Sequence, residues 1–251
     1  MLNVSIKNMA GQTLALSPSS AYTLFEVDGI TPPKANINTM DGALLDGAIF
    51  NSATAQSRNI VLNMAINSPA ETNRLNLYKY AQIKKACTLY FKNSTRNVYI
   101  NGYVEAVEVD VFGKKQTAQV SVICPKPYFM DRTAQTIAFT DTGNVFTNAG
   151  DVDSGATFTV TFSSAVSSLN IDRASGGFFE IVYDFVAGDV VTITTHRGAK
   201  TALLSRNGNI INLINYIAVG SEWFQVLSGS NNFFLTAGSA TVEFSPMYTG
   251  V

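Results

Sequence analysis

The sequence has few of the residues on which most catalytic and metal sites depend. Its 251 residues include two cysteines, one histidine and one tryptophan. A single histidine excludes a histidine-rich metal cluster, and two cysteines with one distant histidine have no spacing typical of a zinc site. Because no export signal is visible, we expect Cys87 and Cys124 to be two reduced thiols, with a disulfide as the less favoured alternative.

Charge and long apolar runs are scarce as well. Charged residues make up 14% of the chain, against roughly 25% in an average soluble domain. The formal net charge is −1 and no run of Lys or Arg exceeds two residues, so the basic stripe that a nucleic-acid binder needs is absent. No apolar run reaches the roughly 18–20 residues of a membrane-spanning helix, and the start "MLNVSIKNMAGQ" lacks a signal-peptide pattern. A surface with so few charges suits a protein that neighbours largely cover.

The first half of the chain is predicted to be rich in strands, with one helix. Residues 59–66 alternate apolar and polar, and residues 98–112 and 116–124 form an antiparallel hairpin with the same period of two. Before them, residues 30–58 show no clear period and contain Pro32 and Pro33, which favour turns. A loop of this length in a compact domain is uncommon and usually functional, so we interpret it as an irregular loop or a hairpin arm.

The helix is expected to begin at a capping box. Ser68 takes the N-cap position, Pro69 the first helical position, and Glu71 reaches back to the cap. We expect the helix to continue to Ala86. Its apolar residues surround most of its circumference, which predicts cover on more than one side; they are Leu75, Leu77, Tyr78, Tyr80 and Ile83.

Past Asp131 the pattern changes to strands alone. Segments of about five to seven residues recur at roughly ten-residue spacing, with Gly, Asn, Asp and Ser in the gaps, which is typical of a β-sandwich or jelly roll. At the boundary, "VICPKPYFMD" (residues 122–131) reads as a strand end followed by a stiff joint, because Pro125 and Pro127 cannot donate ladder hydrogen bonds. We therefore predict a mainly β chain with an α+β domain at 1–131 and a β-sandwich domain at 132–251.

No cluster of residues predicts catalysis, a cofactor or a metal. Cys124 has no neighbouring histidine, because His196 lies in the other half. "GAKT" (198–201) lacks the upstream glycine of a phosphate loop, and "DVDSG" (151–155) lacks the remaining calcium ligands. The acids Glu105, Glu108 and Asp110 fit a solvated strand face better than a glycosidase pair. Trp223 is a candidate sugar platform if exposed, and otherwise a packed core residue.

An ordered set of segments resembles the distal tail proteins (Dit, the siphovirus tail component family) of long-tailed phages. The segments are "ITPPKANI", "RNIVLNMAI", "LYKYAQIKKACTLYFKN", "RNVYINGYVEAVEVDVFGKKQTAQVSVICPKPYF", "GDVDSGATFTV", "GDVVTITTHRGAKTALL" and "WFQVLSGSNNFFLTAGSATVEFSPMYTGV". They run along the whole chain, and "CPKPYF" at the joint is the most specific part.

The resemblance implies a structural hub and no enzyme. The N-terminal domain would assemble into a hexameric ring, and the C-terminal domain would be a galectin-like sandwich. The ring would join the tail tube to the tail-tip or fibre-hub protein around the DNA channel, in the virion at the distal end of the tail, with the tape measure, baseplate and receptor-binding proteins as further partners. The alternative hypothesis is a carbohydrate-binding module that recognises host cell-wall saccharide through the sandwich.

A ring of this kind joins two different patches on each subunit. We expect the segment at residues 41–58 and the apolar helix to supply them. The candidate interface residues are Asp41, Asp46, Phe50, Arg58, Arg74, Tyr78 and Lys85.

Overall fold

A computed structural model of the chain describes residues 2–41 and 46–251. It divides into two compact units, of which unit 1 comprises Met1–Arg132 and Tyr248–Val251 and unit 2 comprises Thr133–Met247. The residues described are mainly β with one α-helix, which confirms the predicted fold class. No helix within them has the length and apolar character needed to cross a membrane.

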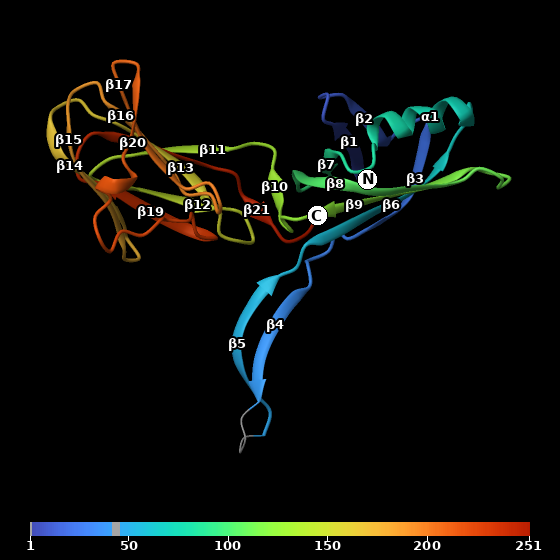
Figure 1. Ribbon diagram of the computed structural model, residues 1–251, viewed down its shortest axis with the longest axis horizontal. Helices are drawn as coiled ribbons and strands as arrows, with labels where there is room; N and C mark the ends of the chain where they lie inside the picture. The colour runs from blue at the N-terminus through green and yellow to red at the C-terminus, as the bar shows by residue number, and fades with distance from the viewer. Residues whose placement is uncertain (1, 42–45) are drawn as a thin grey trace. The chain divides into compact units, whose positions relative to one another are not determined.

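Unit 1 is built on one large sheet (Figure 1). Its elements are β1 (Asn3–Asn8), β2 (Thr13–Ser17), β3 (Tyr22–Asp28), β4 (Ala35–Asp41), β5 (Ala48–Ala55), β6 (Arg58–Ile66), α1 (Ala70–Tyr80), β7 (Ala86–Lys92), β8 (Asn97–Asp110), β9 (Thr117–Cys124) and β10 (Phe129–Asp131). The strand order is β2-β1-β7-β8-β9-β6-β3, with β10 beside β8 and β21 (Met247–Tyr248) beside β10.

The sheet curls toward a barrel. Its two edge strands, β2 and β3, are joined only by residues 18–21 and contact each other, although they lie at opposite ends of the strand order. Such a short connection requires the two edges to approach. The enclosed core takes the inward side chains of each strand, as the period of two predicted, and Leu77 of α1 is fully buried with them.

The helix differs from its prediction at both ends. It starts at Ala70, and the N-cap position is taken by Pro69 in place of Ser68, so there is no side-chain cap. Glu71 pairs with Arg74 and does not complete a capping box. It stops at Tyr80, because the sheet takes the following residues: Lys84 N–H donates to the Val104 carbonyl at 2.8 Å, and Val104 N–H to the Lys85 carbonyl at 3.1 Å. Lys84 adopts a left-handed φ of 63° there.

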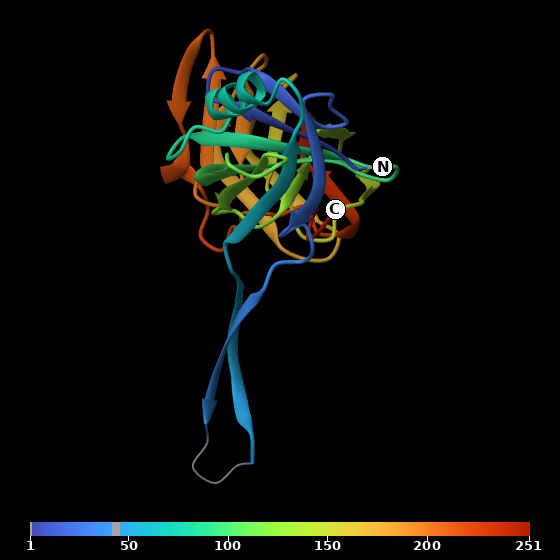
Figure 2. The ribbon, with the colours of Figure 1, turned by 90° about the vertical axis from the view of Figure 1, so that its right-hand side faces the viewer.

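The segment expected to be a loop or an arm is a hairpin arm. Strands β4 and β5 pair with each other in a separate two-stranded sheet. Figures 1 and 2 both show the arm protruding from the rest of unit 1. Every described residue of the two strands is exposed.

Unit 2 is a β-sandwich, as predicted. One sheet has the order β11-β20-β13-β16-β17-β18 and the other β12-β19-β14-β15, with a short 3₁₀ helix η1. The bounds are β11 (Gln135–Phe139), β12 (Asn144–Asn148), β13 (Ala156–Thr161), β14 (Val166–Arg173), β15 (Phe178–Phe185), β16 (Val190–Thr194), β17 (Thr201–Arg206), β18 (Asn209–Asn212), η1 (Ile214–Tyr216), β19 (Gly229–Leu235) and β20 (Ser239–Phe244).

The assignment of residues 132–251 to one domain was wrong for the last residues. Tyr248–Val251 return to unit 1, where the carbonyls of Thr249 and Gly250 accept hydrogen bonds from Arg58 and Arg96. Unit 2 is therefore an insertion within the chain of unit 1.

Phe233 lies at the centre of the unit 2 core and gives a direct test of it. Its ring is fully buried and lies within 5.2–6.1 Å of the rings of Phe139, Phe146, Phe158 and Phe224. We predict that Phe233→Ala lowers the free energy of unfolding of unit 2 by about 3–5 kcal/mol, measured by denaturant unfolding with Trp223 fluorescence. The control, Val145→Ala at an exposed position, should change it by less than about 0.5 kcal/mol. Equal effects would contradict this description of the core.

Candidate assembly surfaces

The arm, here residues 35–41 and 48–55, is amphipathic although none of it is buried. Opposed residues of an antiparallel pair share a face, and the register opposes Ile37 to Ala53 and Thr39 to Phe50. Ile37 and Phe50 are 64% and 63% exposed. Ala35, Ala48, Ala53 and Ala55 lie on the same side, which we call the apolar face of the arm, although Thr39 and the charged Asp41 also lie there. Met40 and Ile49 oppose each other on the other face, 63% and 47% exposed.

The opposite face of the arm satisfies its own polar groups. Asn38 Nδ2 donates to Ser52 Oγ at 3.0 Å, and Gln56 at the base donates to the Asn36 side chain. A two-stranded hairpin is at best marginally stable in water. No other described residue covers the apolar face. A partner that packed against this face would bury apolar surface that is now exposed to water.

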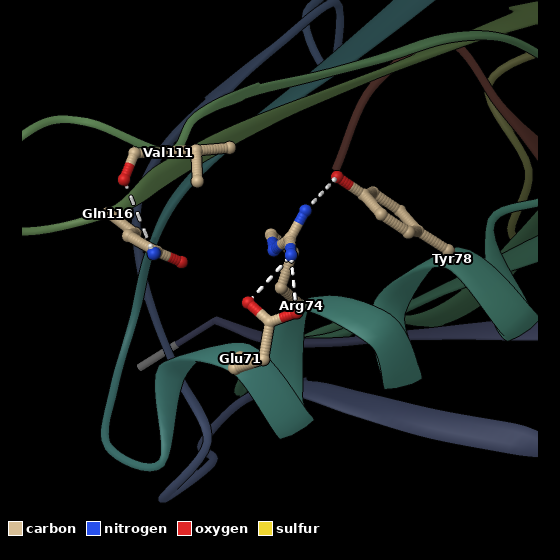
Figure 3. Close-up of polar contacts among 5 residues, drawn as sticks. All are labelled: Glu71, Arg74, Tyr78, Val111 and Gln116. Atoms are coloured by element: carbon tan, nitrogen blue, oxygen red, sulfur yellow. Dashed lines mark hydrogen bonds and ion pairs between the residues drawn. The ribbon is translucent and has the colours of Figure 1, made fainter.

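A second surface is formed by α1 and the β8–β9 hairpin (Figure 3). Arg74 Nη2 donates to both carboxylate oxygens of Glu71 at 2.6 Å, and Nη1 donates to Tyr78 Oη at 3.5 Å. These hydrogen bonds, that of Glu71 first, raise the pKa of Arg74. Gln116 Nε2 donates to the Val111 carbonyl at 3.4 Å. Within residues 2–41 and 46–251, the buried atoms Arg74 Nε and Gln116 Oε1 find no partner.

A shallow groove lies beside this cluster, past the end of α1. Its lining is largely apolar with one cation at the rim: Tyr78, Ala81, Gln82, Ile83, Lys85 and Val107. Ile83 is 57% exposed. Within α1 Leu75 is 48% exposed and Leu77 alone is buried, so this chain by itself covers the helix on one side.

The structure gathers the predicted interface residues in three places. Asp41, Asp46 and Phe50 are exposed in or next to the arm. Arg74, Tyr78 and Lys85 lie at the helix and its groove. Whether neighbours use these residues stays a prediction.

Arg58 is a correction to that set. It is only 4% exposed, and its donors are taken by four backbone carbonyls of unit 1, so it offers nothing to a neighbour. Burial lowers the pKa of this guanidinium. From the sequence, an arginine at the start of a predicted strand is expected to lie on the surface. The burial of Arg58 could not be predicted, because the carbonyls that accept its hydrogen bonds come from segments that are distant in sequence.

Other residues of the two surfaces were not predicted to be interface residues. Ile37 shares the apolar face with Phe50, and Ile83 and Val107 line the groove. No clear period in residues 30–58 signalled Ile37, and its place opposite Ala53 follows only from the register of the hairpin.

The rejected catalytic and binding patterns stay without support. No group of three or more His, Cys, Asp or Glu side chains among the described residues could hold a metal. Cys87 and Cys124 are free and buried, as expected. Glu105, Glu108 and Asp110 are exposed along β8. Trp223 is not an open sugar platform, because it packs edge-on against Phe179 at 5.0 Å.

Comparison with known proteins decides the family of the C-terminal part. Residues 149–248 match the model of the siphovirus-type tail component, C-terminal domain. The resemblance to phage distal tail proteins is thereby confirmed. Among curated proteins, none matches the sequence at a significant level.

Solved structures share the fold of the whole chain. The crystal structure of the SPP1 Dit (gp 19.1) protein, described as a paradigm of the hub adsorption apparatus in phages that infect Gram-positive bacteria, matches with a TM-score of 0.75 and 14% identity over 97% of this chain and 98% of that one. Chains of the phage P2 baseplate in its activated conformation, with Ca and with Sr, match with a TM-score of 0.58 and 9% identity over the full length of both chains.

The buried thiols give unit 1 a predictable response to alkali. Burial raises the pKa of Cys87 and of Cys124 from 9.0 to about 12. The folded state thus favours the neutral thiols, and their contribution to stability is complete below pH 9 and is lost as the pH rises toward 12. We predict a fall in the unfolding midpoint of unit 1 across this range, and a shallower fall in Cys87→Ala/Cys124→Ala. Identical slopes for the two proteins would contradict the burial of these thiols.

Proposed function

We propose that this chain is a distal tail protein, the structural hub at the end of a long phage tail. The match of residues 149–248 to the tail component family carries the proposal. The fold shared along the whole chain with the SPP1 Dit protein supports it. In this role the protein acts by assembly geometry, without catalysis or a cofactor, in the virion at the distal end of the tail.

The hub is a hexameric ring made by unit 1. A closed ring needs a head-to-tail contact between two different patches of each subunit. The apolar face of the arm and the groove beside α1 are two such patches on one unit. We assign the arm of one copy to the groove of the next, where Ile37 and Phe50 meet Ile83 and Val107, with Lys85 at the rim.

The ring surrounds the DNA channel and carries the other tail proteins. In the register of the sheet, Glu26, Asn63, Gln119 and Glu108 form a row across β3, β6, β9 and β8. The cation on these four strands is Arg58, which is buried. A face with this charge does not hold a polyanion and suits a passage for DNA. The partners are the tail tube, tape measure and tail-tip hub proteins, with baseplate or receptor-binding proteins outside.

The mass of the protein in solution tests the ring. We expect light scattering of the purified chain, alone or with the tail tube protein, to give a species of about six copies, seen as rings by negative-stain imaging. A strict monomer under both conditions would contradict the hexameric ring. A monomer that binds purified cell-wall polysaccharide would favour the carbohydrate-binding alternative.

Variants of the arm test how the ring closes. Burying Ile37 or Phe50 in a neighbour contributes about 1.5–3 kcal/mol each, so Ile37→Asp and Phe50→Asp should leave a folded monomer and abolish rings. The matched control is Asn38→Asp, which adds the same charge to the polar face and should preserve rings. Deletion of residues 41–51 should act like Ile37→Asp. Rings that persist in all three arm variants would exclude the arm from the contact.

A further inference from the structure

The arm is joined to the body of unit 1 only at its root, where the chain enters at residues 29–34 and leaves at residues 56–57. Strands β4 and β5 pair with each other and have no place in the large sheet. At the bottom of the arm, Gln56 N–H donates to the Lys34 carbonyl at 2.9 Å and closes the strand pair. The direction of the arm therefore depends on how the root is held.

Three consecutive carbonyls of the entering segment are all bound. Arg58 Nη1 donates to the carbonyls of Gly29 at 2.6 Å and Thr31 at 2.8 Å. The carbonyl between them, that of Ile30, accepts from Val251 N–H at 3.1 Å. The first and third carbonyls thus share one partner and the middle carbonyl has another, so two separate groups hold the segment.

Close packing allows little movement of this segment. Gly29 has a φ of +79°, and a Cβ there would lie 2.0 Å from the Asn59 carbonyl oxygen. A Cβ on Gly250 would lie 3.0 Å from the Ile30 carbonyl oxygen and 3.4 Å from Pro32 Cδ. Only glycine fits the first position, and the second is tighter than most side chains tolerate.

One guanidinium joins the root to the rest of the unit. Arg58 Nε donates to the Pro127 carbonyl at 2.9 Å, Nη2 donates to the Thr249 carbonyl at 2.6 Å, and the group lies 4.5 Å from the centre of the Phe129 ring. The fork of donors on arginine reaches four acceptors at once, which the single ammonium of lysine cannot do.

The returning segment is fixed from its other side. The carbonyl of Gly250 accepts from Arg96, and the Arg96 guanidinium lies 4.4 Å from the centre of the Tyr248 ring. Tyr248 Oη donates to Asp131 at 3.4 Å. The returning segment that holds the root is therefore itself fixed in place by Arg96 and Asp131.

We infer that Arg58 and Tyr248–Val251 form a clamp that sets the direction of the arm. Arg58 is a positioning residue: it touches no neighbour and acts through the root. The use of the clamp in assembly rests on the proposed ring, whereas its effect on the arm is a property of the single chain. A clamped arm meets the next copy in one orientation, at a lower entropic cost than a free one.

Distances between spin labels on the arm and the body measure the clamp directly in full-length chains that all carry Ile37→Asp, the substitution expected to keep the protein monomeric. Ring formation is followed in the same clamp variants without Ile37→Asp. Thr54→Cys on the arm and Gln119→Cys on β9 are exposed sites, while Cys87 and Cys124 are buried and stay unlabelled. We expect one narrow distance distribution in the parent protein. Arg58→Lys and deletion of residues 249–251 should each replace it with a broad one, with unchanged circular dichroism.

Two further variants keep the result interpretable. Arg206→Lys in unit 2 changes an arginine bound to Asp189 and to the Asp184 carbonyl and should leave the distribution narrow. Gly250→Val keeps every hydrogen-bond donor of the clamp but places a side chain against the Ile30 carbonyl at the root. It replaces Arg58→Lys as the test if that variant does not fold. A narrow distribution in the folded clamp variants would overturn the inference whether or not rings form. A broad distribution in clamp variants that still form rings would instead leave the clamp in place and count against its role in assembly.

Discussion

The buried guanidinium of Arg58 is the constraint on which the arrangement of unit 1 depends. It binds carbonyls from the arm root, from the joint after β9 and from the segment that returns after unit 2. An isolated buried cation costs several kcal/mol unless its hydrogen bonds are satisfied. No described carboxylate pairs with it, and carbonyl dipoles with the face of Phe129 take that place. These three segments therefore have to be positioned together.

This constraint explains how one unit combines a closed core with an exposed arm. The curled sheet buries its inward side chains and stabilises the body. The arm contributes nothing to that core, and within its described strands Asp41 is the one charged residue. Surfaces that stay in water normally carry about 25–35% charged residues. The low charge of the whole sequence thus extends to the exposed arm, the surface that a neighbour covers in the proposed ring.

Much of the fold could be predicted because short-range periodicity determined it. The alternation in β6, β9 and β13 gave the buried face of each strand, and the lack of any helical period after Asp131 indicated a sandwich. The C-terminal end of the helix could not be predicted, because the backbone groups of Lys84 and Lys85 form hydrogen bonds with Val104 of the sheet and so do not continue the helix. The place of Arg58 and of the last residues depends on contacts across more than a hundred positions, which no local pattern encodes.

The insertion of unit 2 has a consequence for the order of events during synthesis. Tyr248–Val251 complete the root of the arm, and the ribosome makes them only after all of Thr133–Met247. Domains generally fold as they emerge, N-terminal parts first. Here the earlier unit cannot acquire its final contacts until the later one has been translated. A nascent chain with an unfinished sandwich thus still lacks the contacts of Thr249 and Val251 that hold Arg58 and the root of the arm.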